Sequence, residues 1–145
     1  MKLFQIEEPD GALYDSDGPG ASVGIAIAAG NVGRVAIAVG GNPEILPDAD
    51  GNRSLAMPPR TPAHDLLLGL RGRAEKQLAR PVTHAVIAAD ERDRAAIERA
   101  APDAGIAILR FVALAEAAAL AKGAAPDEAS VLGAAIAAED LAPVP

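Results

Sequence analysis

Short apolar runs alternate with turn-forming residues along the middle of the chain. Two such runs, residues 23–28 and 35–39, flank Gly30, Asn31 and Gly33. Glycine and asparagine adopt positive φ angles at little cost, so this segment predicts a β-hairpin. We expect this hairpin to be the element around which the rest of the chain folds.

Further along, the spacing of apolar residues distinguishes helices from strands. Between residues 62 and 78 they recur at steps of three and four, which indicates one face of an amphipathic helix. The run at residues 81–89 predicts a buried strand, and Asp90 is a favourable cap for a helix over residues 91–100. The other expected elements are strands over residues 44–47 and 106–111 and helices within residues 113–123 and 126–136, the last capped by Asp127.

The beginning of the chain has a different composition. Residues 1–5 predict a short strand, whereas residues 7–20 are rich in proline, glycine and aspartate, as in a loop or mobile lead-in. We therefore expect a lead-in over residues 1–21, one domain over residues 22–141 and a tail over residues 142–145. A chain of 145 residues can bury a core without disulfides or a metal.

Composition and charge exclude several classes of protein. Half of the residues are apolar but only 2% are aromatic, so the core must consist of small and aliphatic side chains. The net charge of −7 argues against nucleic acid or an anionic membrane surface as a partner. The chain contains no cysteine, and no apolar run approaches the roughly 20 residues that span a bilayer. The first residues of the sequence do not resemble a secretory signal, so we expect a cytoplasmic location.

Several segments resemble the nucleotide-binding domain of Hsp70 chaperones. Residues 40–54 read Gly-Gly-Asn-Pro-Glu-Ile-Leu-Pro-Asp-Ala-Asp-Gly-Asn-Arg-Ser, where the family has Gly-Gly-Lys-Pro-Glu-Val-Ile-Pro-Asn-Ala-Glu-Gly-Asn-Arg-Thr. Residues 126–136 read Pro-Asp-Glu-Ala-Ser-Val-Leu-Gly-Ala-Ala-Ile, which is similar to Pro-Asp-Glu-Ala-Val-Ala-Leu-Gly-Ala-Ala-Ile. Residues 24–31 resemble the family's first hairpin, Gly-Ile-Asp-Leu-Gly-Thr-Thr-Asn.

The resemblance implies a fold. It predicts an α/β protein with a single ribonuclease-H-like lobe of the actin-like ATPase type. Its mixed sheet would have five strands: the first three antiparallel, two more beside the first, and helices on its faces. The family's second lobe would fall between Gly123 and Pro126, and a further insertion between Met57 and Pro62, and this chain lacks both.

The resemblance also implies that the family's chemistry has been lost. In the family, the hairpin aspartate orders water around Mg²⁺ and the threonine hydroxyls approach the phosphates. In this chain Ala26 occupies the position of that aspartate, and Ala29 and Gly30 occupy the positions of the two threonines. Leu114 replaces a glutamate that lies beside the metal in the family. Methyl groups perform neither task, so we expect no catalytic residue, no metal and no cofactor.

The sequence is compatible with two functions, one as an interaction protein and one as a nucleotide-binding module. The first is a non-catalytic, Hsp70-like regulator, scaffold or partner subunit that acts through contacts with another protein or with itself as a homo-oligomer. The alternative is a residual module that binds ATP or ADP with magnesium, is completed by dimerisation, and uses Gly24, Gly30, Asn31 and Asp127. Ribonuclease-H-like nuclease activity would require several carboxylates around two metals, and Ala26 argues against it.

Other polar residues suggest structural roles. His64 is interpreted as a residue at a helix start and His84 as an exposed strand residue, because neither has a partner at metal-ligand spacing. The charged run over residues 90–94 is interpreted as a capped, solvated helix start. Gly30 and Gly33 could offer backbone N–H groups to a phosphate, but a turn explains them as well.

Overall fold

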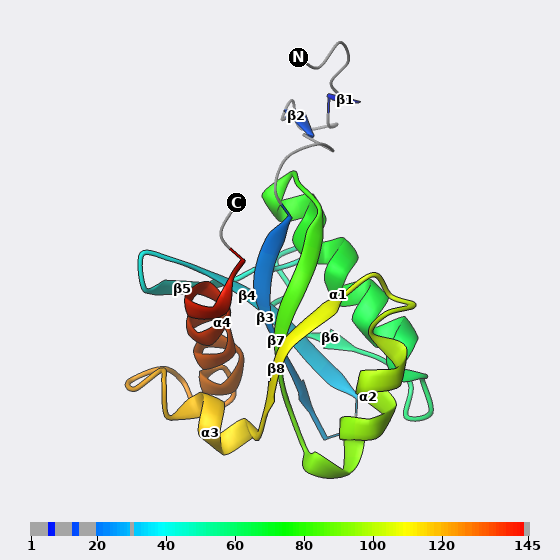
Figure 1. Cartoon of the computed structure of the whole chain (residues 1–145), viewed down its shortest axis with the longest axis vertical. Helices are drawn as coiled ribbons and strands as arrows, with labels where there is room; N and C mark the ends of the chain where they lie inside the picture. Colours follow the sequence, from blue (N-terminus) through cyan, green and yellow to red (C-terminus); the bar gives the residue numbers. More distant parts are fainter. Residues whose placement is uncertain (1–5, 8–12, 15–19, 30, 144–145) are drawn as a thin grey trace.

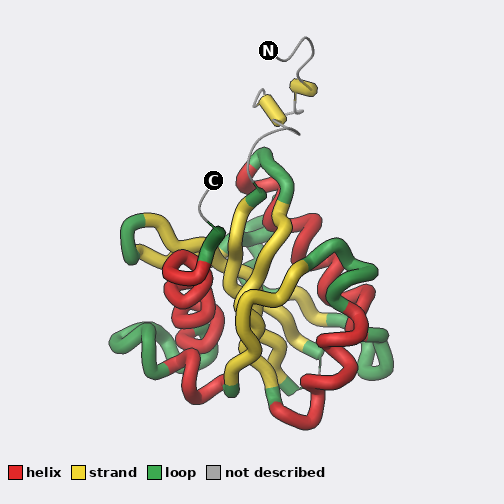
Figure 2. The backbone as a smooth tube through the Cα atoms, in the orientation of Figure 1, coloured by secondary structure: helices red, strands yellow, loops and turns green. Residues whose placement is uncertain are grey.

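A mixed sheet with helices on both faces forms the body of the protein, as seen in a computed structural model (Figures 1 and 2). The structure describes residues 6–7, 13–14, 20–29 and 31–143. Five strands follow the order β5-β4-β3-β7-β8, and β6 pairs with β4 outside this path. The strands are β3 (Ala21–Ala28), β4 (Val32–Val39), β5 (Asn42–Ile45), β6 (Leu55–Ala56), β7 (Val82–Ala89) and β8 (Ala107–Val112).

The α/β class is confirmed, but the expected number and order of strands are wrong. The sheet has six strands instead of five, because Leu55 and Ala56 pair with Gly33 and Val32 at the start of β4. β5 pairs with the other end of β4, so two short strands share one edge. Strand β4 is antiparallel to β3 and β5, whereas β3, β7 and β8 run parallel.

The central hairpin is confirmed, although its turn is shorter than expected. Ala28 pairs with Val32, and Asn31 has a φ of 58°, which asparagine tolerates well. Gly33 was expected in the turn, but it pairs with Ile27 within the sheet. A Cβ atom at Gly33 would lie 2.7 Å from Cδ1 of Leu70, so this glycine allows a helix to approach the sheet.

The helices are α1 (Ala63–Leu78), α2 (Arg94–Ala100), α3 (Leu114–Ala118) and α4 (Ala129–Leu141), with a 3₁₀ turn, η1 (Glu91–Asp93), before α2. Helices α1 and α2 cover one face of the sheet, and α3 and α4 cover the other (Figure 1). Asp90 caps η1 as expected, since its carboxylate accepts a hydrogen bond from the backbone N–H of Arg92. Within the described residues, no helix is long and apolar enough to cross a membrane.

The predicted capping role of Asp127 is wrong. The last helix begins at Ala129, and its N-cap is Glu128, whose side chain makes no capping hydrogen bond. The carboxylate of Asp127 lies 3.7 Å from the guanidinium of Arg34 instead. Asp127 precedes the N-cap Glu128, and its side chain is 69% exposed.

In the N-terminal region, two short strands form a separate antiparallel pair. Strand β1 (Ile6–Glu7) pairs with β2 (Leu13–Tyr14). The sequence suggested only loop at Leu13–Tyr14, so that expectation is wrong there. The strand predicted over residues 1–5 lies outside the described residues.

Candidate functional site

Two of the positions that carry chemistry in the resembling family, those of Ala26 and Leu114, lie against apolar side chains, whereas Ala29 is exposed. Ala26 is 7% exposed and belongs to the cluster of small residues between the sheet and helices α3 and α4. Leu114, at the start of α3, packs against the same cluster. Neither side chain has an oxygen atom, so neither can hold a metal-bound water.

Gly24 also faces this cluster, where helix α4 covers it. A Cβ atom on Gly24 would overlap the backbone of Ala134 and Ala135 in α4. The glycine therefore lets a strand and a helix come into backbone contact. A ligand has no access to Gly24 while α4 is in place.

A group of charged side chains lies on the same face. Arg34 is the cross-strand partner of Ala26, and its side chain, which is 17% exposed, reaches Asp127. Arg53 binds Glu128 through two hydrogen bonds, of 2.7 Å from Nε to Oε2 and 3.0 Å from Nη2 to Oε1. The hydrogen bonds from Arg53 lower the pKa of Glu128. These pairs connect the start of α4 to β4 and to the turn before β6.

Asn31 has a structural task at the end of the hairpin. Its side-chain nitrogen donates to the carbonyl oxygens of Pro58 and Pro59, at 3.0 Å each. Its backbone oxygen accepts a hydrogen bond from the N–H of Met57. The turn thereby holds the loop that leads from β6 to α1.

The structure does not gather the residues proposed for nucleotide binding around one cavity. Asp127 pairs with Arg34 on the α4 face, whereas Asn31 lines a cavity on the α1 face. Gly24 lies beneath α4, and Gly30 is outside the described residues. The nucleotide alternative therefore stays a prediction, with its residues spread over both faces of the sheet.

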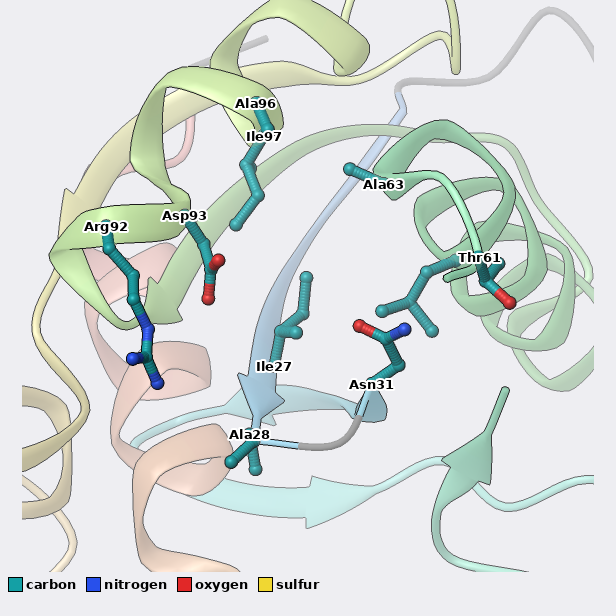
Figure 3. A pocket seen from close by; sticks show the side chains of 11 residues that line it. Ile27, Ala28, Asn31, Thr61, Ala63, Arg92, Asp93, Ala96 and Ile97 are labelled. Carbon is teal, nitrogen blue, oxygen red and sulfur yellow. The ribbon is translucent and has the colours of Figure 1, made fainter. Parts of the chain in front are cut away.

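The cavity near Asn31 has a volume of about 290 Å³ and lies at the carboxyl ends of β3 and β7 (Figure 3). Its walls come from three segments that are distant in sequence. After β3 the chain returns as β4 on one side, and after β7 it crosses to β8 on the other. Ligands of α/β proteins commonly bind where connections diverge in this way. The lining residues are Ile27, Ala28, Ala29, Asn31, Thr61, Ala63, Leu66, Arg92, Asp93, Ala96 and Ile97.

Two polar side chains approach this cavity from opposite sides. Asp93 precedes α2, and its carboxylate points into the cavity (Figure 3). Across from it, the amide oxygen of Asn31 faces the cavity. The hydroxyl of Thr61 donates to the carbonyl oxygen of Pro58 at 2.8 Å. The site thus presents hydrogen-bond acceptors above an apolar floor.

Sequence reasoning did not find this cavity. The interpretation of residues 90–94 as a capped helix start is confirmed for Asp90, but it missed the different direction of the Asp93 side chain. The position of Asp93 shortly after a buried strand was the available signal, because such positions lie at the functional edge of an α/β sheet.

The two histidines are paired with neighbouring residues. Nδ1 of His64 lies 3.1 Å from a carboxylate oxygen of Asp65, and this hydrogen bond raises the pKa of His64. His84 was expected to be exposed but is half-buried, with Nδ1 2.7 Å from the hydroxyl of Thr83. In the part of the chain that the structure describes, no group of three or more histidine, aspartate or glutamate residues could hold a metal ion.

Comparison with known proteins adds no relative. A scan against models of protein families matches none of them, and a search of curated proteins finds no match.

Proposed function

We propose that this chain is a non-catalytic, ribonuclease-H-like single lobe related to Hsp70 ATPase domains, and that it acts through contacts with proteins. The arrangement of β3, β4 and β5 as antiparallel neighbours, with β7 and β8 parallel beside β3, supports such a lobe. The proposal includes a cytoplasmic location and self-association or one partner chain.

One observation carries the proposal. The two positions that would need carboxylates hold Ala26 and Leu114, and both pack into the apolar cluster beneath α3 and α4. An actin-like ATPase stabilises phosphoryl transfer with charged groups, ordered metal ions and the exclusion of water between two lobes. A single lobe with apolar side chains at these positions supplies neither the charges nor the closure.

Four large apolar side chains are exposed among the described residues, where a partner could cover them. Large apolar side chains are exposed on several elements, and such residues contribute to interfaces where they gather. The exposed fractions are 69% for Val39, 45% for Leu68, 52% for Leu120 and 43% for Leu141.

Light scattering at increasing concentration, combined with an ATP-turnover assay, tests the proposal. We expect a mass above the 14.6 kDa of one chain, or a saturable complex with one partner, and no ATP turnover. A monomer at every concentration that also forms no saturable complex would contradict the proposal. Magnesium-dependent turnover by the purified chain would contradict it as well.

A further inference from the structure

We propose that the cavity at the carboxyl ends of β3 and β7 binds the side chain of a lysine or arginine presented by a partner protein. This inference rests on the proposed function and specifies the chemistry of the partner. It uses the cavity on the α1 face and none of the positions beneath α4.

The direction of the Asp93 side chain is the first observation. The helical segment is capped upstream, where Asp90 accepts a hydrogen bond from the N–H of Arg92 at the start of η1. Asp93 follows as the last residue of η1 with helical φ and ψ angles of −92° and −6°, and its side chain makes no hydrogen bond to the helix. Its carboxylate points into the cavity instead (Figure 3). A negative charge is thus placed where a ligand would bind.

Asn31 contributes a second acceptor. Because its amide nitrogen donates to the carbonyl oxygens of Pro58 and Pro59, the orientation of the side chain is fixed. This orientation turns the amide oxygen toward the cavity (Figure 3). Acceptors on two sides complement a group that carries several N–H donors, as ammonium and guanidinium groups do.

The floor of the cavity suits the aliphatic part of such a side chain. Ile27, Leu66 and Ile97 line it and are 7%, 3% and 2% exposed. Lysine and arginine commonly place their methylene groups on apolar surface while the charged end meets polar partners. The volume of about 290 Å³ is close to the lower limit for small-ligand sites, which fits one side chain better than a nucleotide.

Arg92 is the cationic residue in the lining, and the carboxylate with which it forms an ion pair is that of Asp90. The Arg92 side chain is 76% exposed, and Nε lies 3.6 Å from the carboxylate of Asp90. Figure 3 shows its side chain running beside Asp93 toward the level of Ala28, on the opposite side of the cavity from Asn31. The chain as a whole carries a net charge of −7, which favours the approach of a basic partner.

Nuclear magnetic resonance titrations test the site. The probes are N-acetyl-arginine amide and N-acetyl-citrulline amide, which have nearly the same shape, but only the first carries a charge. We expect the arginine probe to shift the backbone amide signals of Asn31, Asp93 and Ala96, and the citrulline probe to bind about tenfold more weakly or not at all.

Two variants locate the effect. Asp93→Asn is expected to weaken binding of the arginine probe about tenfold or more, whereas the control Asp140→Asn, at an exposed position near the end of α4, leaves it unchanged. Ala96→Leu keeps the charge and narrows the cavity, so it should also weaken binding. This second variant keeps the test valid if Asp93→Asn fails to fold.

Equal binding of the two probes, no shifts at the cavity, or an unchanged affinity in both cavity variants would overturn the inference. Much tighter binding of agmatine, a free small amine, than of the capped arginine would overturn the assignment to a partner side chain. Nucleotide binding by the chain would contradict the proposed function but not the binding of the arginine probe to the cavity. A failed probe titration would contradict the cavity inference but not the proposed function.

Discussion

The two faces of the sheet are packed in different ways. The face beneath α1 and α2 is filled by large aliphatic side chains, of which Leu67, Leu70 and Ile97 are almost completely buried. The face beneath α3 and α4 is filled mainly by alanine, with Val131 as one of its few larger members. Side-chain size sets the distance between a helix and a sheet, so helices packed on alanine can approach the strands more closely than helices packed on leucine and isoleucine.

This difference determines where a ligand can bind. On the α4 face the backbone of the helix touches β3 at Gly24, and a Cβ atom on Gly133 would overlap the carbonyl oxygen of Ala117 in α3. Close contact of this kind excludes a ligand from the positions around Ala26. On the other face, larger side chains border a cavity at the end of the hairpin. The aliphatic face therefore leaves more room for a ligand, with a cavity of about 290 Å³ against one of about 110 Å³ beside α3 and α4.

Removing a large side chain from the aliphatic face should have the greatest effect. Leu67→Ala leaves a cavity at a fully buried position, so we expect the free energy of unfolding to fall by about 3 to 4 kcal/mol. The control is the adjacent Leu68→Ala, whose side chain is 45% exposed and which should change stability by about 0.5 kcal/mol or less. Urea unfolding measures both, and equal effects would show that the face is not packed as described.

Adding a methyl group to the alanine-rich face should have a somewhat smaller effect. Gly24→Ala pushes β3 against the backbone of α4, so we expect a loss of about 2 to 3 kcal/mol. Gly72→Ala is the matched control, since nothing lies within 4 Å of a Cβ at that helical position and the change should stabilise the protein by up to about 1 kcal/mol. A neutral Gly24→Ala would mean that α4 does not contact the strand.

Breaking the ion pair at the start of α4 should have the smallest effect. Arg53 lowers the pKa of Glu128, so the pair stabilises the folded state above the ordinary carboxyl value of 4.5, and this contribution is lost as the pH falls through the lowered pKa. Because the Arg53 side chain is 55% exposed, solvent screening limits the loss in Arg53→Gln to about 1 kcal/mol or less at neutral pH.

The pH dependence provides the check on this pair. Urea unfolding of both proteins should show a difference at pH 7 that shrinks as the pH drops below 4.5. A difference that stays constant, or grows, on acidification would contradict the role of Glu128 as the partner.

Local patterns in the sequence predicted most of the elements, because turns, caps and amphipathic spacing act over a few residues. The hairpin around Asn31 and the capping by Asp90 are examples. Two predictions were wrong at positions that meet distant residues. Asp127 lies near Arg34 and does not cap α4, and Gly33 lies in the sheet, where Leu70 packs too closely for a Cβ atom. The cavity could not be predicted, because its lining residues come from the end of β3 and Asn31, from residues 61–66 and from residues 92–97, which meet only in the fold.

Calorimetric titration with ATP and with ADP, in the presence of Mg²⁺, measures whether the chain binds a nucleotide. Our claim is that the packing of α4 and the apolar side chains of Ala26 and Leu114 leave no phosphate site on the described residues of the hairpin. It predicts no saturable heat, or binding only in the millimolar range. Saturable micromolar binding of either nucleotide would contradict it.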